Sequence, residues 1–191
     1  MHALRAALGD DADLMVDLHW QYTADDALAL ARALAAARPY FIEAPCAPED
    51  VAGLSRVAAE SGLPVAAGEE WRNVFEAQLR LEYAPLAYVQ PEMAHTGVSQ
   101  FVAIAALAAA RSAGVIPHAT IGVGIFMAAS LHAAATLVRC PYHEYQHSVF
   151  DRNLQYVDTT MHCTAGFYHL PTGPGHGVTP RPELWQHMVP T

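Results

Sequence analysis

The sequence predicts an α/β protein in which about six parallel strands alternate with helices. Short apolar runs alternate with longer stretches rich in Ala and Leu, which is the pattern of repeated β/α units. Helix-ending signals are followed at once by apolar runs, as in S-G-L-P at Ser61–Pro64 and S-A-G-V at Ser112–Val115. In addition, an acidic residue or a histidine ends each apolar run at a nearly constant interval.

The order of elements follows from these signals. The predicted strands are Leu14–Leu18, Tyr40–Ile42, Pro64–Ala67, Ala87–Gln90, Val115–Pro117 and Tyr142–Tyr145. The predicted helices are Asp25–Ala37, Glu49–Ser61, Asn73–Leu81, Ser99–Ala113 and Ile125–Val138. The first helix starts at T-A-D-D, where a threonine cap precedes acids in the first turn.

The domain organisation changes near Phe150. We predict one β/α domain over residues 1–150, since 191 residues suit a single core. Beyond it, Pro, Gly and His become frequent, as in P-T-G-P-G-H-G-V. Residues 151–191 are therefore predicted to form an irregular C-terminal tail that packs on the barrel-like domain.

Composition excludes several classes of function. The net charge of −9 argues against a nucleic-acid-binding surface, which needs a basic patch. The sequence contains no run of about 18 uninterrupted apolar residues, so no membrane span is predicted. The N-terminus lacks a basic-then-apolar leader, so a cytoplasmic location is expected. The three cysteines suggest neither a disulfide framework nor a zinc knuckle. All ten basic residues are Arg, so this chain alone cannot supply a lysine base.

The polar residues at the strand ends keep a period. They close the runs L-M-V-D, F-I-E, V-A-A-G-E, Y-V-Q-P-E, V-I-P-H and H-E at Asp17, Glu43, Glu69, Glu92, His118 and Glu144. The intervals are 26, 26, 23, 26 and 26 residues, one β/α unit each time. In a β/α barrel, the C-terminal ends of the strands converge on the active site. Acids also follow strands by chance, but chance does not keep a period.

The first three acids form a candidate metal site. Three carboxylates at one barrel mouth repel each other unless a cation neutralises them. Oxygen ligands from Asp17, Glu43 and Glu69 favour a hard ion, and we expect Mg²⁺. Glu70 is the alternative to Glu69, which we prefer because it follows Gly68 and continues the 26-residue step.

The next strands carry candidate acid–base residues. A carboxylate at Glu92 beside His118 would fix the imidazole tautomer and raise its basicity, as a general base near neutral pH requires. The alternative for His118 is a core histidine bonded to backbone. His19, two residues beyond Asp17, shares its strand face and suits an acid that protonates a departing hydroxyl. The alternative for His19 is a solvated loop residue.

Other motifs carry weaker signals. H-E-Y-Q-H lacks a helix to place His143 and His147 on one face, so it is a poor zinc motif. The tail histidines are interpreted as surface or packing residues. G-V-G at Gly122–Gly124 could receive a substrate carboxylate or phosphate at a helix N-terminus, or it is only a tight turn.

The ordered motifs resemble the enolase superfamily, in its mandelate racemase/muconate lactonizing enzyme-like branch, and most of all the sugar-acid dehydratases. The resemblance covers V-D-x-H, F-I-E-A-P, A-G-E-E, Q-P-E, I-P-H and H-E, from Arg5 to about Val178. It implies that Asp17, Glu43 and Glu69 bind Mg²⁺. It further implies that His118 is the base of a His–carboxylate dyad and that Glu144 lies near the substrate carboxylate as a hydrogen-bonding acid.

Two residues depart from the family pattern. The dyad carboxylate of the family is usually Asp, whereas this chain has Glu92, which has a longer arm. The first metal ligand is often followed two residues later by Asn, whereas His19 stands here, as in some dehydratases of the branch.

The resemblance also implies a fold that is incomplete. Family members begin with a capping domain and two further barrel strands, and a full barrel takes about 250 residues. We therefore expect an incomplete TIM-type (β/α) barrel of about six βα units that lacks the N-terminal capping domain and the first two strands. Its open edges would be closed by self-association or by a partner chain that supplies the missing strands.

The implied reaction is Mg²⁺-dependent abstraction of the proton α to a carboxylate. Dehydration of a sugar acid to a 2-keto-3-deoxy acid is preferred, with His118 as the base and His19 or His118 assisting loss of the β-hydroxyl. A racemase or cycloisomerase is the near alternative, in which His19 would have to be the second base. The third hypothesis is a catalytically silent barrel remnant. A metal-dependent hydrolase fits less well, because it would use more histidine ligands.

Overall fold

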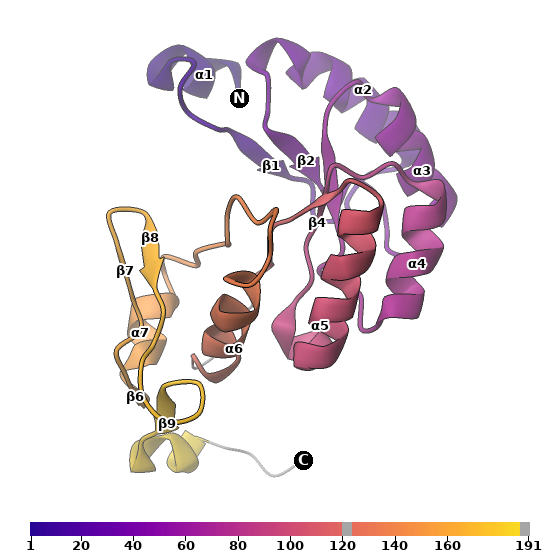
Figure 1. Ribbon diagram of the computed structural model, residues 1–191. Helices are drawn as coiled ribbons and strands as arrows, with labels where there is room; N and C mark the ends of the chain where they lie inside the picture. The colour runs from indigo at the N-terminus through magenta and orange to yellow at the C-terminus, as the bar shows by residue number, and fades with distance from the viewer. Residues whose placement is uncertain (120–123, 188–191) are drawn as a thin grey trace.

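The computed structural model describes residues 1–119 and 124–187, and its centre is a five-stranded parallel sheet (Figure 1). The strands are β1 (Met15–Asp17), β2 (Phe41–Glu43), β3 (Val65–Ala67), β4 (Tyr88–Val89) and β5 (Gly114–Val115). They lie in sequence order, each hydrogen-bonded to the next. Sequential parallel strands are the arrangement of a β/α barrel wall, which confirms the predicted fold class.

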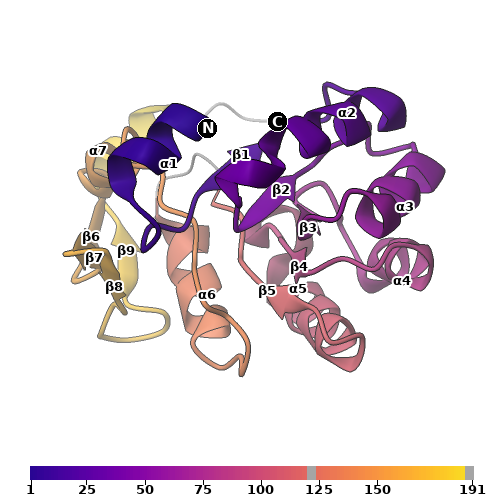
Figure 2. The same ribbon diagram turned by 90° about the horizontal axis from the view of Figure 1, so that it is seen from above.

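The helices lie on one side of this curved wall. The helices between and after the strands are α2 (Ala24–Leu34), η1 (Ala35–Ala37), α3 (Val51–Glu60), α4 (Val74–Tyr83), α5 (Met93–Ala110) and α6 (Ile125–Ala134). In Figure 2 the strands form an arc, and α2 to α5 lie along its outer side. A short helix α1 (His2–Leu8) precedes β1, and Arg5 ties it to η1 through a bond to the Ala37 carbonyl.

The sixth predicted strand, Tyr142–Tyr145, is not part of the sheet. Its segment still runs beside β5, because Val115 N–H donates to the Arg139 carbonyl and Glu144 N–H donates to the Pro117 carbonyl. Pro117 and Pro141 have no N–H to add to a ladder, so regular pairing stops. The prediction of a sixth paired strand was therefore wrong, although the segment occupies the neighbouring position.

Helix α5 starts earlier than predicted and is bent. Its first turn is separated from the rest at Gly97, whose φ of 63° and ψ of 171° are not helical. This break explains why the sequence pattern indicated a start only at Ser99. By length and hydropathy alone α5 could cross a membrane, with 28% of it buried in the described chain. It packs against α4, α6 and β4, as a barrel helix does.

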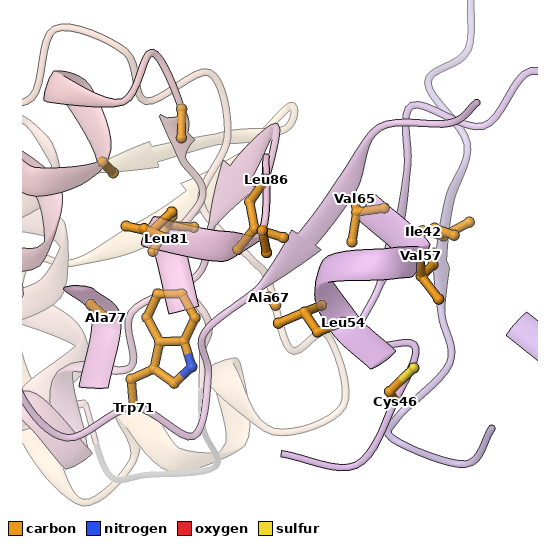
Figure 3. Close-up of a cluster of buried hydrophobic side chains, with 14 of the residues drawn as sticks. Ile42, Cys46, Leu54, Val57, Val65, Ala67, Trp71, Ala77, Leu81 and Leu86 are labelled. Atoms are coloured by element: carbon orange, nitrogen blue, oxygen red, sulfur yellow. The ribbon is translucent and has the colours of Figure 1, made fainter. Parts of the chain in front are cut away.

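The main core lies between the sheet and its helices. Outward-facing strand residues such as Ile42, Val65 and Val89 are fully or almost fully buried. Figure 3 shows Ile42 and Val65 beside Val57 of α3, with Trp71 and Leu81 in the same cluster. Alternation along each strand sends one set of side chains to this core and the other set to the inside of the barrel.

The inner face carries a second, smaller apolar layer. Phe41 is buried there with Ala66 and Ile116, and the ring centroids of Tyr40 and Tyr88 lie 5.2 Å apart. Gly114 makes room for this layer, since a Cβ at that position would lie 2.8 Å from the Tyr88 ring. This apolar layer lies inside the barrel below the carboxyl ends of the strands, and the polar residues lie above it at those ends.

The chain after residue 150 is more regular than the expected irregular tail. It contains α7 (Phe150–Leu154), β6 (Val157–Thr159), β7 (His162–Thr164), β8 (Phe167–His169), β9 (Val178–Pro180) and η2 (Pro182–His187). β6 pairs with β9 and β7 pairs with β8, both antiparallel. The β7–β8 turn uses Ala165 and Gly166, both with positive φ, as a two-residue hairpin turn requires.

Candidate active site

The candidate site lies at the carboxyl ends of the parallel strands. Asp17 and Glu43 are the last residues of β1 and β2, and they are partners in the strand register. Glu69 follows the end of β3, and Glu92 and His118 follow β4 and β5 and form a parallel bridge with each other. The register therefore brings residues that are far apart in sequence to one rim.

The backbone is strained directly after these strands. His19, Trp20 and Ala44 have φ values of 45°, 60° and 43°, in the left-handed region that such residues rarely adopt. Gly68 has a φ of 127°, and a Cβ there would lie 3.1 Å from the Trp71 ring. Strain of this kind costs on the order of 1–3 kcal/mol per residue and concentrates at functional sites.

His118 and Glu92 form a close pair at this rim. His118 Nδ1 lies 2.8 Å from Glu92 Oε2, and the Glu92 side chain is buried. Glu92 also caps α5, because Ala94 N–H donates to its Oε1. A carboxylate held in this way accepts the Nδ1 proton, so Nε2 of the neutral imidazole faces the site as the free base.

Two further carboxylates face the other nitrogen of His118. Its Nε2 lies 3.2 Å from Glu69 Oε2 and 3.6 Å from Glu144 Oε2. Burial lowers the pKa of His118, but the bond to Glu92 and the surrounding negative charges outweigh it and raise the pKa to about 9. Beside these three carboxylates the imidazole therefore holds its proton at neutral pH.

Glu144 is held by two hydrogen bonds to its carboxylate. Ala119 N–H donates to Oε2 at 2.7 Å, and Gln146 Nε2 donates to Oε1 at 2.9 Å. Burial raises the pKa of Glu144, whereas His118 and the Ala119 amide act in the opposite direction. The carboxyl group is thus fixed beside the imidazole.

Glu43 lies at the centre of the acidic residues. Burial raises the pKa of Glu43, and a hydrogen bond from Gln90 lowers it. The charges of Asp17, Glu69 and Glu144 raise it further, to about 8. A cation bound beside these carboxylates would lower the pKa of Glu43 again, because opposite charge favours the ionised form.

His19 stands between two of the expected metal ligands. Its Nδ1 lies 3.8 Å from Asp17 Oδ2 and 3.9 Å from Glu69 Oε1. Within residues 1–119 and 124–187, no three His, Cys, Asp or Glu side chains surround one point as metal ligands do. The His19 ring is exposed. Asp17, Glu43 and Glu69 by themselves offer only oxygen donors, the type that a hard divalent cation prefers.

Glu70, the alternative to Glu69, points elsewhere. Its Oε1 lies 3.8 Å from Arg80 Nε of α4, and the Arg80 guanidinium lies over the Trp71 ring at 5.9 Å. Glu69 instead faces both His118 and His19. The geometry therefore favours Glu69 as the acid of the rim.

Two neighbours of the site were not predicted from the sequence. The Gln90 side chain is buried and bonds to Glu43, and its own Oε1 has no described partner. His95 Nδ1 lies 3.0 Å from the Glu69 carbonyl. Gln90 was detectable in principle, because it shares a strand face with Glu92 two residues later. The Gly122–Gly124 motif lies mostly outside the described residues, which exclude 120–123.

Comparison with known proteins places the chain in a family. The sequence profile of the enolase C-terminal domain-like family matches residues 1–184. Because this match covers nearly the whole chain, the chain belongs to that family.

Individual relatives show what the chain resembles in sequence and in fold. The D-galactonate dehydratase of Ralstonia nicotianae is 38% identical over 68% of this chain and 34% of its own length. A member of the enolase superfamily from Agrobacterium tumefaciens has a TM-score of 0.94 at 45% identity, over 97% of this chain and 48% of its own. A racemase from Streptomyces coelicolor A3(2), solved with bound magnesium, has a TM-score of 0.84 at 30% identity, covering 97% and 49%.

These relatives are much longer proteins. The chain spans about one third to one half of their lengths.

Proposed function

We propose that the chain forms the catalytic part of a Mg²⁺-dependent acid-sugar dehydratase. The observation that carries the proposal is His118, whose Nδ1 is bound to buried Glu92 while its Nε2 faces the acidic rim. The dehydratase relative supports the reaction class, and the racemase with bound magnesium supports the metal. The substrate would be a small-molecule sugar acid.

The rim carboxylates are proposed to hold the metal. Asp17, Glu43 and Glu69 would be its ligands, since they come from three neighbouring strands and the charges of Asp17 and Glu69 act on the Glu43 carboxyl group. The chemistry supplied there by bound Mg²⁺ is neutralisation of charge at the substrate carboxylate, which acidifies the neighbouring C–H bond. The same neutralisation would lower the pKa of His118 toward neutrality, because Glu69 would no longer act as a full charge beside it.

The acid–base steps are assigned to the chain's own residues. His118 Nε2 takes the proton from the carbon next to the carboxylate, and Glu92 stabilises the imidazolium that forms. The β-hydroxyl leaves as water with a proton from His19 or from His118. The electron pair of the C–H bond becomes the C=C bond of an enol, which converts to the 2-keto-3-deoxy acid without any oxidant. Glu144 would hydrogen-bond the substrate carboxylate.

Isomerisation is the second candidate, and one observation favours it. The imidazoles of His19 and His118 both lie near Glu69, at 3.9 Å and 3.2 Å from its two oxygens. Two bases around one reacting carbon are what racemisation requires. The racemase relative is consistent with this geometry.

The deciding experiment measures product formation from a panel of sugar acids, with Mg²⁺ and with EDTA. We expect a 2-keto product with Mg²⁺ only, and its loss in His118→Ala. His147→Ala is the matched control, because His147 is exposed and its only described bond comes from its backbone amide, to Tyr145. Epimerised substrate without 2-keto product would select the isomerase. No turnover beside measurable Mg²⁺ binding would identify a silent remnant.

Location and assembly are part of the proposal. We place the protein in the cytoplasm, where its three free cysteines would remain reduced. We also propose that it forms a homo-oligomer or joins a partner chain, because β1 has no neighbour on its outer edge within the described residues.

A further inference from the structure

We infer that Tyr168, together with the His143–Ser130 pair, positions Glu144, so that the C-terminal hairpin helps to build the candidate site. Tyr168 lies on β8, which pairs with β7 in a two-stranded sheet separate from the barrel sheet among the described residues. Its hydroxyl nevertheless donates to the Glu144 carbonyl at 2.8 Å. The inference rests on the proposed function, because it concerns the orientation of a proposed active-site residue.

The Glu144 carbonyl has a second donor, His143. His143 Nδ1 lies 3.1 Å from this carbonyl oxygen, and a carbonyl only accepts, so Nδ1 carries the proton. His143 Nε2 then accepts from the Ser130 hydroxyl, at 2.8 Å. Burial lowers the pKa of His143 to about 4, which is consistent with a neutral imidazole that donates on one side and accepts on the other.

Ser130 anchors this chain of bonds to the barrel. It lies on α6 and is 2% exposed, so its hydroxyl has no access to bulk water as an alternative partner. The bonds thus run from α6 through His143 to the Glu144 backbone. Tyr168 contributes the second bond from outside the barrel. The Glu144 carbonyl oxygen therefore accepts one bond from His143 and one from Tyr168.

Aromatic packing fixes the Tyr168 ring. Its centroid lies 5.5 Å from His143, 5.3 Å from Phe150 and 5.8 Å from Tyr145, with the rings close to perpendicular. Edge-to-face contacts of this kind define ring orientation. The hydroxyl therefore holds its direction, and the hairpin is coupled to the residue that faces His118.

The consequence for catalysis is geometric. The Glu144 carboxylate lies 3.6 Å from His118 Nε2, within the space where the substrate carboxylate is proposed to bind. Misplacement of a reacting group by about 1 Å can cost up to about 100-fold in rate. Loss of one of the two bonds to the Glu144 carbonyl should shift the residue by less than this, so we expect about a tenfold loss of rate.

The test compares Tyr168→Phe with Tyr145→Phe. Both variants lose one hydroxyl from the same aromatic cluster, but the Tyr145 hydroxyl contacts exposed Asp151 and not Glu144. The local reporter is the Ala119 amide proton in an NMR spectrum, since this N–H donates to Glu144 Oε2. Tyr168→Phe should move this resonance upfield and lower kcat about tenfold, while KM stays within about twofold. Tyr145→Phe should change neither.

A second pair of variants separates positioning from a loss of folding. His143→Asn keeps an N–H donor near the place of Nδ1, whereas His143→Leu has none. The Ala119 resonance should stay near its native position in the first variant and move in the second. Thermal unfolding of each variant shows whether the fold is retained.

The outcomes distinguish this inference from the proposed function. An Ala119 resonance that moves in Tyr168→Phe, in a chain without turnover on any acid, would keep the positioning role and overturn the dehydratase. An Ala119 resonance that does not move beyond its position in Tyr145→Phe would overturn the positioning role. The positioning role would also be overturned if the native chain is active and Tyr168→Phe retains its full kcat.

Discussion

His118 illustrates how single residues acquire their chemistry here. An isolated imidazole would titrate near neutral pH, and burial alone would favour its neutral form. Three carboxylates within 3.6 Å reverse this tendency. A cation bound among the acids would remove part of their charge. Binding of a cation to the neighbouring acids would therefore convert His118 from a stable imidazolium into a base.

His19 offers the sharpest test at the level of one residue. In His19→Ala we expect Mg²⁺ to bind at least as tightly, because the imidazole between Asp17 and Glu69 is gone. Exchange of the α-proton with D₂O should persist through His118, while 2-keto product falls about 100-fold, as expected for loss of a general acid. Proton NMR in D₂O follows both. An unchanged product rate would assign both proton transfers to His118.

Much of the rim could be predicted from single residues, and some could not. Glu43 and Glu92 were detectable because each ends or follows an apolar strand at a fixed interval. Gln90 follows the same alternation along its strand, whereas His95 and Tyr168 reach the site through contacts that no local pattern encodes. Tyr168 in particular touches Glu144 from 24 residues away, through a separate hairpin. Such contacts depend on tertiary packing and not on periodicity.

The elements around the site depend on local caps. Asn73 begins α4, and its Oδ1 accepts from the amides of Phe75 and Glu76 at 3.0 and 3.1 Å. We expect Asn73→Ala to lower the free energy of unfolding by about 1 kcal/mol, and Asn73→Asp to retain most of it. Urea denaturation measures both. Equal losses in the two variants would show that the cap is not the cause.

The segment that carries His143 should make stability depend on pH. In the unfolded chain this histidine titrates near its ordinary pKa of 6.5, whereas the folded value is about 4. Below pH 6.5 the unfolded state therefore binds a proton that the folded state does not. Stability is lost as pH falls from about 6.5 to about 4, by about 3 kcal/mol at most.

Urea denaturation across this pH range checks the expectation against His143→Asn. The groups that face the imidazole are Glu144 and Tyr168, with charge effects from Glu92 and His118. In His143→Asn, the free energy of unfolding should fall less between pH 6.5 and pH 4, because the contribution of His143 is absent. Parallel curves for the two proteins would mean that His143 titrates alike in both states.

Element boundaries show why sequence patterns succeeded only in part. The five paired strands follow clear apolar runs, and these were predicted. The prediction of a sixth strand was wrong because Pro117 and Pro141 lack the N–H groups that a ladder between the two segments needs. The start of α5 was predicted too late because Gly97 interrupts its first turns. The C-terminal strands are three residues long and lie among Pro, Gly and His, so their pairing is fixed by tertiary contacts.

At the scale of the whole molecule, the wall of the barrel is open. Beside β1, the apolar side chains of Leu4, Leu8 and Met15 are 51%, 56% and 39% exposed. Open edges with exposed apolar residues favour pairing with another chain. We expect a mass above the 20.6 kDa of one chain in sedimentation velocity, and a shift toward the monomer in Met15→Lys. A native monomer at all concentrations would contradict this expectation.

The central claim is that Asp17, Glu43 and Glu69 share one divalent cation beside His118. Isothermal titration calorimetry with Mg²⁺ at pH 8 tests it most directly, on the native chain and on Glu43→Gln. The account predicts one Mg²⁺ site, with an affinity at least about tenfold lower in Glu43→Gln. Mutation of a residue that only supports a metal ligand typically lowers metal affinity about 10–100-fold, and loss of a ligand should cost at least as much. Glu49→Gln changes an exposed acid that is not one of the proposed ligands, and this variant should bind Mg²⁺ as the native chain does. Equal affinities in all three proteins, or no binding to the native chain, would contradict it.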